Sequence, residues 1–101
     1  DNLKLIDCPL PEPKSGQVRV KITSIGLNRG DLLFIQNRYF IKPLVNSRIG
    51  FEAAGYVDAL GPTNSSTKPT FKLGDRVALC PMSFDVHTPG CMAEYGVYNE
   101  S

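Results

Sequence analysis

The sequence has no tryptophan, only one histidine and no cluster of basic residues, because its lysines and arginines are scattered singly. Proteins that hold nucleic acid usually group such residues around phosphates, so we expect no nucleic-acid partner. Apolar runs are also short. None approaches the roughly 20 residues of a membrane helix, so we expect no membrane partner. A dinucleotide-binding glycine motif is missing as well, because no glycine opens a helix after a strand.

The remaining composition is that of one small globular domain over residues 1–101. Of the 101 residues, 42% are hydrophobic and 21% are charged, and the formal net charge is +1. A chain of this length buries roughly 60–65% of its unfolded surface, which is enough for one core. The opening "DNLKLIDC" reads as the inside of a strand, so we expect a fragment of a longer polypeptide.

The cysteines indicate a compartment. Cys8, Cys80 and Cys91 form an odd set in a sequence without secretory features, which favours reduced thiols. We therefore expect a cytoplasmic protein, with the mitochondrion as the alternative.

The clearest strand pattern is "QVRVKITSI", residues 17–25. Val18, Val20 and Ile22 alternate there with polar side chains, as on a sheet with one solvated face. Residues 48–60 predict a second strand, with a bulge or sharp bend at Gly55.

Two more strands are predicted in the second half. "RVAL", residues 76–79, follows Gly74, which stands where a tight turn requires positive φ. A further strand with alternating side chains is expected over residues 91–98. We expect one of its faces to carry Cys91, Ala93, Tyr95 and Val97.

One segment predicts a helix. Asp31 can cap a short helix or helical turn across "LLFIQN", residues 32–37. The long connections are rich in proline, glycine and polar residues. Short strands, such connections and almost no helix predict a small, mainly β barrel or sandwich with at most one or two short helices.

A metal site and a tyrosine are the candidates for chemistry. Zinc favours sulfur and imidazole ligands, and the residues considered as ligands are Cys80, Asp85, His87 and Cys91. The closely spaced Cys pair of a structural site is missing, so we expect no metal.

A tyrosine hydroxyl can donate a hydrogen bond to a developing oxyanion. Tyr39, after a helix-like segment, is such a candidate, and the alternative is a packing tyrosine with a solvated hydroxyl.

Glu52 stands inside the apolar run "RIGFEAAGYVDALG", beside the bulky Phe51. A buried carboxylate is costly unless a partner compensates its charge. Composition and periodicity alone give no reason for this pair of residues.

Four stretches together resemble the N-terminal catalytic domain of the medium-chain dehydrogenase/reductase superfamily. They are "LPEPKSGQVRVKITSIGLNRGD", "GFEAAGYVDALG", "FKLGDRV" and "GCMAEYGVYNE". The resemblance implies a GroES-like, partly open β-barrel. It also implies that the polypeptide continues into a Rossmann domain, absent here, that binds most of an NADPH cofactor. The isolated chain is then expected to be inactive.

The resemblance also indicates the zinc-independent branch of this superfamily. Zinc-dependent members have Cys and His ligands at the places held here by Asn28 and Phe51, and the four-cysteine lobe of those members is absent. Phe51 would then fill the space of a metal and its ligand. Glu52 matches an acidic position shared by both branches. Its implied role is structural, as an acceptor of hydrogen bonds or the partner of a buried Arg.

Two activities within that branch are implied. Quinone oxidoreductases resemble "GLNRGD" through Asn28 and have a tyrosine matching Tyr39, although Leu33 replaces a second family tyrosine. The alternative is a 2-enoyl thioester reductase. In either case Asn28 and Tyr39 would be the catalytic and cofactor-binding residues, stabilising the oxygen of a small conjugated carbonyl substrate. The alternative resembles this sequence through Asp31, Ile35, Gln36 and Tyr39.

The resemblance further implies a homodimer for the complete protein. A non-enzymatic function stays open beside the reductase interpretation. The chain is close in size to a co-chaperonin subunit of related fold, and a partner-binding relative without activity has the same sequence features.

Overall fold

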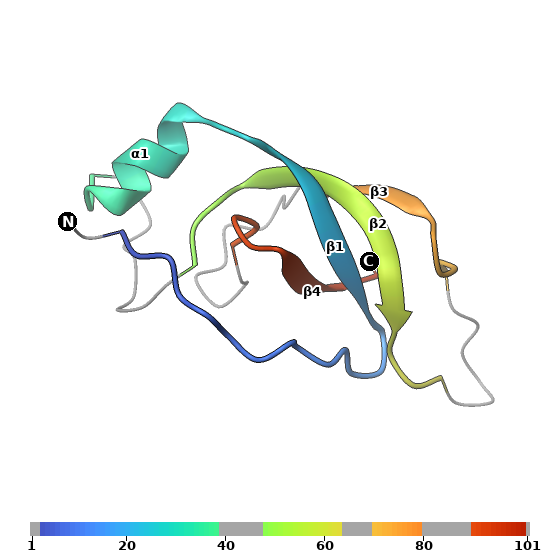
Figure 1. The fold of residues 1–101 in the computed structure, drawn as a ribbon. Coiled ribbons are helices and arrows are strands. Elements are labelled where there is room, and N and C mark those ends of the chain that lie inside the picture. Colours follow the sequence, from blue (N-terminus) through green and yellow to red (C-terminus); the bar gives the residue numbers. More distant parts are fainter. Residues whose placement is uncertain (1–2, 39–47, 64–69, 80–89, 101) are drawn as a thin grey trace.

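The computed structural model describes residues 3–38, 48–63, 70–79 and 90–100. Within these ranges one antiparallel sheet has the strand order β3-β2-β1-β4 (Figure 1). The mainly β fold with one short helix is confirmed, and the open, curved sheet agrees with a partly open barrel. Among the described residues, the structure contains no helix with the length and hydropathy of a membrane span. The elements are β1 (Gln17–Gly26), α1 (Arg29–Ile35), β2 (Glu52–Leu60), β3 (Arg76–Leu79) and β4 (Tyr95–Asn99).

The core lies on the apolar face of β1, as its alternation predicts. Val18 is 4% exposed and Val20 is 1% exposed, and both contact Val57 of β2, which is 1% exposed. Burying a side chain of this size stabilises the fold by about 1.5–3 kcal/mol. Partly buried side chains pack around these three valines: Ile22, Leu60, Phe71, Val77, Leu79 and Tyr98.

The pairing of β1 with β2 is irregular beside Gly55. Ile22 pairs with Gly55, but Ser24 pairs with Ala54, so Thr23 is an extra residue on β1. A Cβ atom at Gly55 would overlap the carbonyl oxygen of Lys21. The glycine therefore permits a close backbone approach at a bulge. The expected bulge is present, but its extra residue lies in the strand opposite Gly55.

The turn before β3 also follows the sequence prediction. Gly74 has a φ of +90°, and its N–H donates to the carbonyl oxygen of Val57 at 2.8 Å. The carboxylate of Asp75 accepts a hydrogen bond from the N–H of Lys72 at 2.9 Å, which closes the turn. β3 spans the four predicted residues, Arg76–Leu79.

The prediction for the last strand was wrong about its start. β4 begins at Tyr95 instead of residue 91, and its Tyr98 packs against the core. A Cβ atom at Gly96 would overlap the Tyr98 hydroxyl, so the glycine makes room for the ring. Tyr95 instead lies under the Arg19 guanidinium, whose central carbon is 5.7 Å from the ring centroid.

The N-terminal segment is not part of the sheet, although its sequence suggested a strand. Residues 3–10 are exposed. Arg19 holds the following residues, because its guanidinium donates to the carbonyl oxygen of Pro11 at 3.1 Å. The same guanidinium donates to the Asp58 carboxylate at 2.9 Å and lies 3.7 Å from that of Glu12. One arginine thus fastens this segment to β1 and β2.

Candidate functional site

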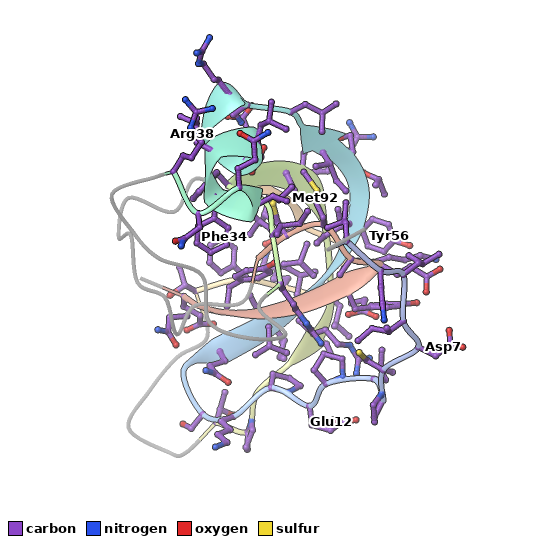
Figure 2. The ribbon with its side chains drawn as sticks, turned by 90° about the vertical axis from the view of Figure 1, so that its left-hand side faces the viewer. Asp7, Glu12, Phe34, Arg38, Tyr56 and Met92 are labelled. Atoms are coloured by element: carbon purple, nitrogen blue, oxygen red, sulfur yellow. The ribbon has the colours of Figure 1, made fainter. Side chains whose placement is uncertain are left out.

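Two other parts of the chain, residues 48–52 and residues 90–92, lie beside the connection from the end of β1 to α1. Gly26, the last residue of β1, pairs with Glu52, the first residue of β2. The N–H of Met92 donates to the carbonyl oxygen of Ile49 at 2.9 Å, so residues 90–92 lie beside residues 48–50. Phe34 projects from the lower side of α1 in Figure 2. These contacts define the junction, by which we mean residues 26–34, 48–52 and 90–92.

Asn28 occupies the entrance to α1. It is exposed, and it is the N-cap residue, with φ of −126° and ψ of 151°. The extended backbone follows from its place between a strand and a helix. The structure therefore puts this predicted site residue at a fixed and accessible position of the junction.

The cap of α1 differs from the sequence prediction. Asp31 is not the N-cap but the third helical residue, and α1 covers Arg29–Ile35 instead of residues 32–37. Asp31 Oδ2 accepts the Asn28 N–H at 2.9 Å, and the Asp31 N–H donates to the Asn28 carbonyl oxygen at 3.0 Å. The sequence signal for this arrangement is an Asn followed three residues later by an acid, as in a capping box.

Asp31 is also the buried charged residue of the described part of the chain. It is 5% exposed, and its Oδ1 has no hydrogen-bond partner among the described residues. Burial of this residue was not predicted, because acids in the first turn of a helix are usually solvated and interact with the helix dipole.

Phe51 packs against α1. Its ring centroid lies 6.1 Å from that of Phe34, and the two rings are inclined by 74°, which is an edge-to-face contact. A phenyl ring offers no lone pair to a metal ion. The part of the chain that the structure describes holds no group of three or more His, Cys, Asp or Glu residues that could bind a metal. Cys80, Asp85 and His87 lie outside it.

The carboxylate of Glu52 is not buried, which resolves the question posed by its apolar surroundings. Glu52 is exposed and its side chain lies directly against Gly26. The expected pairing with a buried arginine is not found in the described ranges, where Arg19 pairs with Asp58 and Glu12 instead. Since the β2 pleat turns this position toward solvent, the charge needs no partner.

Cys91 lies on the inner side of the junction and is 3% exposed. A Cβ atom at Gly50, whose φ is +112°, would come within 2.8 Å of the Cys91 sulfur. Burial raises the pKa of the Cys91 thiol, a backbone hydrogen bond partly offsets this, and the charges of Asp31 and Glu52 raise it further. The thiol is therefore held neutral and is a poor nucleophile at neutral pH.

Tyr98 is the second neutral group behind the junction. Burial, followed by the charge of Cys91, raises the pKa of Tyr98 to about 12, although Arg48 acts in the opposite direction. Its hydroxyl has no hydrogen-bond partner among the described residues. Both groups are unsuited to proton transfer near neutral pH.

We expect the two described cysteines, Cys8 and Cys91, to differ in their rates of thiol alkylation. Cys8 is exposed and Cys91 is buried. Because its pKa is raised, Cys91 carries less thiolate than an ordinary cysteine at any pH below that pKa, so iodoacetamide should label Cys8 first throughout the range from neutral to mildly alkaline pH. Peptide mass mapping of timed samples measures both rates, and a sample in denaturant provides the control. Equal labelling rates of Cys8 and Cys91 in the folded protein would contradict the buried environment.

Tyr39, the other predicted site residue, lies outside the described residues. Its proximity to Asn28 stays a prediction. Of the two site residues predicted from sequence, the structure therefore places one.

Comparisons with known proteins point to one family. The family described as alcohol dehydrogenase GroES-like domain matches residues 14–101. Among curated proteins, quinone oxidoreductase of Sus scrofa is 37% identical over 92 residues, covering 90% of this chain and 25% of that protein. The chain spans between 17% and 25% of the length of the first curated relatives that it matches.

Solved structures give a consistent result. The structure of a 2-haloacrylate reductase is similar with a TM-score of 0.64 and 29% identity, covering 92% of this chain and 24% of that one. A quinone oxidoreductase of Thermus thermophilus, whose complex with NADPH is also known, has a TM-score of 0.67 and 26% identity. That match covers 95% of this chain and 25% of the other.

Proposed function

This chain belongs to the family of alcohol dehydrogenase GroES-like domains, and we propose that it is the substrate domain of an NADPH-dependent, zinc-independent oxidoreductase. The substrates we infer are quinones or other conjugated carbonyl compounds. The similarity to quinone oxidoreductases supports this, as does the known NADPH complex of one of them. Because the family match is to alcohol dehydrogenase domains, the co-chaperonin interpretation is not favoured. For the complete protein we propose a homodimer.

The observation that carries the proposal is the chemistry of the junction. The resemblance to the medium-chain dehydrogenase/reductase superfamily implies that Asn28 and Phe51 match positions where zinc-dependent members have metal ligands. Phe51 is engaged in an edge-to-face contact with Phe34 and has no atom that can coordinate. These residues do not fit a catalytic zinc ion. Asn28 is exposed, and its amide can donate hydrogen bonds to a cofactor or a substrate oxygen.

The proposed roles follow from where charge develops. Bound NADPH would supply a hydride to an electrophilic carbon of the substrate. As the carbonyl oxygen of the substrate becomes negative, a preorganised donor stabilises it. Asn28 is the donor that the described residues offer, and Tyr39 is the second donor that we propose. Cys91 and Tyr98 are excluded from this role because both side chains face the interior.

The proposal is tested by assaying the complete polypeptide that carries this domain after dialysis against a chelator. We expect NADPH oxidation with a quinone to continue unchanged, with bound zinc far below the roughly one ion per chain of a true zinc site. Elemental analysis and the decay of NADPH absorbance measure the two quantities, with NADH as a parallel cofactor. Loss of activity that added zinc restores would refute the zinc-independent assignment.

A second candidate is the reduction of a carbon–carbon double bond conjugated to an acyl group. The similarity to a 2-haloacrylate reductase favours it, because that name denotes such a bond beside a carboxylate. A 2-enoyl thioester added to the same assay distinguishes the two candidates. A much higher kcat/KM for the thioester than for the quinone would make this second candidate the preferred function.

A further inference from the structure

We propose that Asp31 is a positioning residue, which fixes Asn28 so that its side-chain amide is directed at the substrate oxygen. This inference rests on the proposed function, since it requires Asn28 to be a donor to that oxygen. It is carried by the contacts between the two residues and by the burial of the Asp31 carboxylate.

Both backbone polar groups of Asn28 bond to the same residue. The Asn28 N–H donates to Asp31 Oδ2 at 2.9 Å. The Asn28 carbonyl oxygen accepts the Asp31 N–H at 3.0 Å. Since both backbone polar groups of Asn28 are bound to Asp31, the direction of its Cα–Cβ bond is fixed, and its side chain lies in a capping-box arrangement with the Asp31 backbone. An amide attached to such a backbone is largely preorganised.

The burial of Asp31 is more than a helix cap requires. The residue is 5% exposed, and Oδ1 has no hydrogen-bond partner among the described residues. Burying a carboxylate with an unpartnered oxygen costs free energy. A seven-residue helix could instead be capped by a solvated side chain. An unsatisfied buried polar group in a native structure calls for an explanation, and a role at a functional site is one such explanation.

Asp31 also connects the interior of the junction with its exposed side. On the interior side its charge acts on Cys91, raising the pKa of that thiol. Cys91 is in turn packed against Gly50, whose missing side chain leaves the sulfur its space. On the exposed side Asp31 binds Asn28. The Asp31 carboxylate is therefore close enough to Cys91 to act on its charge and is hydrogen-bonded to Asn28 on the exposed side.

A double-mutant cycle in the complete polypeptide tests this role. The variants are Asp31→Ala, Asn28→Ala, the double variant, and Asp31→Asn as the conservative control. We expect Asp31→Ala to lower kcat about 10- to 100-fold, as small misplacements of catalytic groups do, with KM nearly unchanged. Asp31→Asn keeps an acceptor oxygen for the Asn28 N–H and should retain most of kcat. In the Asn28→Ala background, Asp31→Ala should have little further effect on kcat.

Three results would overturn the proposal. If Asn28→Ala lowers kcat but the effect of Asp31→Ala is the same in both backgrounds, Asp31 does not act through Asn28, and the proposed function still stands. The same holds if Asp31→Ala lowers only the midpoint of thermal unfolding. If Asn28→Ala leaves kcat unchanged, Asn28 is not the donor, and its role in the proposed function is overturned as well. Should Asp31→Ala not fold, Asp31→Val fills the buried space and replaces it in the cycle.

Discussion

Replacing Tyr39 with phenylalanine in the complete polypeptide is expected to lower kcat by about 10²–10³-fold, the usual effect of removing one donor to a developing oxyanion. KM should change little, because the aromatic ring stays and ground-state contacts are largely kept. Under the proposed function, the substitution removes one hydroxyl that we propose donates to the oxygen that becomes negative after hydride transfer. The loss therefore falls on the transition state, which kcat reports.

Steady-state kinetics with NADPH and two substrates, a quinone and a 2-enoyl thioester, measure this effect. Tyr56→Phe is the matched control, because Tyr56 is 37% exposed on β2 and lies away from α1 (Figure 2). The control should leave both rates unchanged. A loss confined to the thioester would favour the second candidate function, since only that reaction needs a proton for the enolate carbon. Rates within a few-fold of the parent on both substrates would remove Tyr39 from the site.

Gly55→Ala is expected to lower the free energy of unfolding more than Gly74→Ala does. The new Cβ atom would overlap the carbonyl oxygen of Lys21, which is backbone and cannot rotate away. Relief requires β1 and β2 to separate at their bulge, next to the core valines Val20 and Val57. Overpacking of this kind typically costs about 1–3 kcal/mol, and we expect the upper end because backbone must move.

Gly74→Ala is the comparison that isolates the contribution of space. Gly74 has a φ of +90°, but apart from its two chain neighbours no described residue lies within 4 Å of the place that an alanine Cβ would take, so only backbone strain opposes the substitution. That strain costs about 1–2 kcal/mol. Urea unfolding of both variants gives the two free energies, and unchanged slopes would indicate comparable denatured states. A smaller loss for Gly55→Ala than for Gly74→Ala would contradict the close approach at the bulge.

The sheet was largely predictable because its strands carry strong local signals. From Gln17 to Thr23, β1 alternates between polar and apolar residues, so its buried face follows from period two. β3 follows a glycine whose positive φ a tight turn demands. β4 was harder, because both of its faces carry large side chains, and the contact of Tyr98 with the core valines decides which one faces the core. That contact is invisible in the alternation itself.

The site was predictable only in part, for related reasons. Asn28 was identified from a resemblance, and its place at the start of α1 agrees with an N-cap preference for asparagine. The burial of Asp31 could not be predicted, because an acid in the first turn of a helix is ordinarily solvated and only tertiary packing removes it from water. Likewise, the exposure of Glu52 depends on which face of β2 meets the core. Tertiary contacts, not local propensity, determine both.

The strand order of the sheet has a consequence for this domain while the ribosome is synthesising it. β1 lies between β2 and β4, and Gln17 pairs with Asn99, so one edge of β1 is closed by residues near the other end of the chain. Until those residues have been synthesised, the N–H and C=O groups along that edge have no partner strand. An unpaired edge beside apolar valines is prone to pair with other chains. Completion of β4 therefore gives this edge of β1 its partner strand.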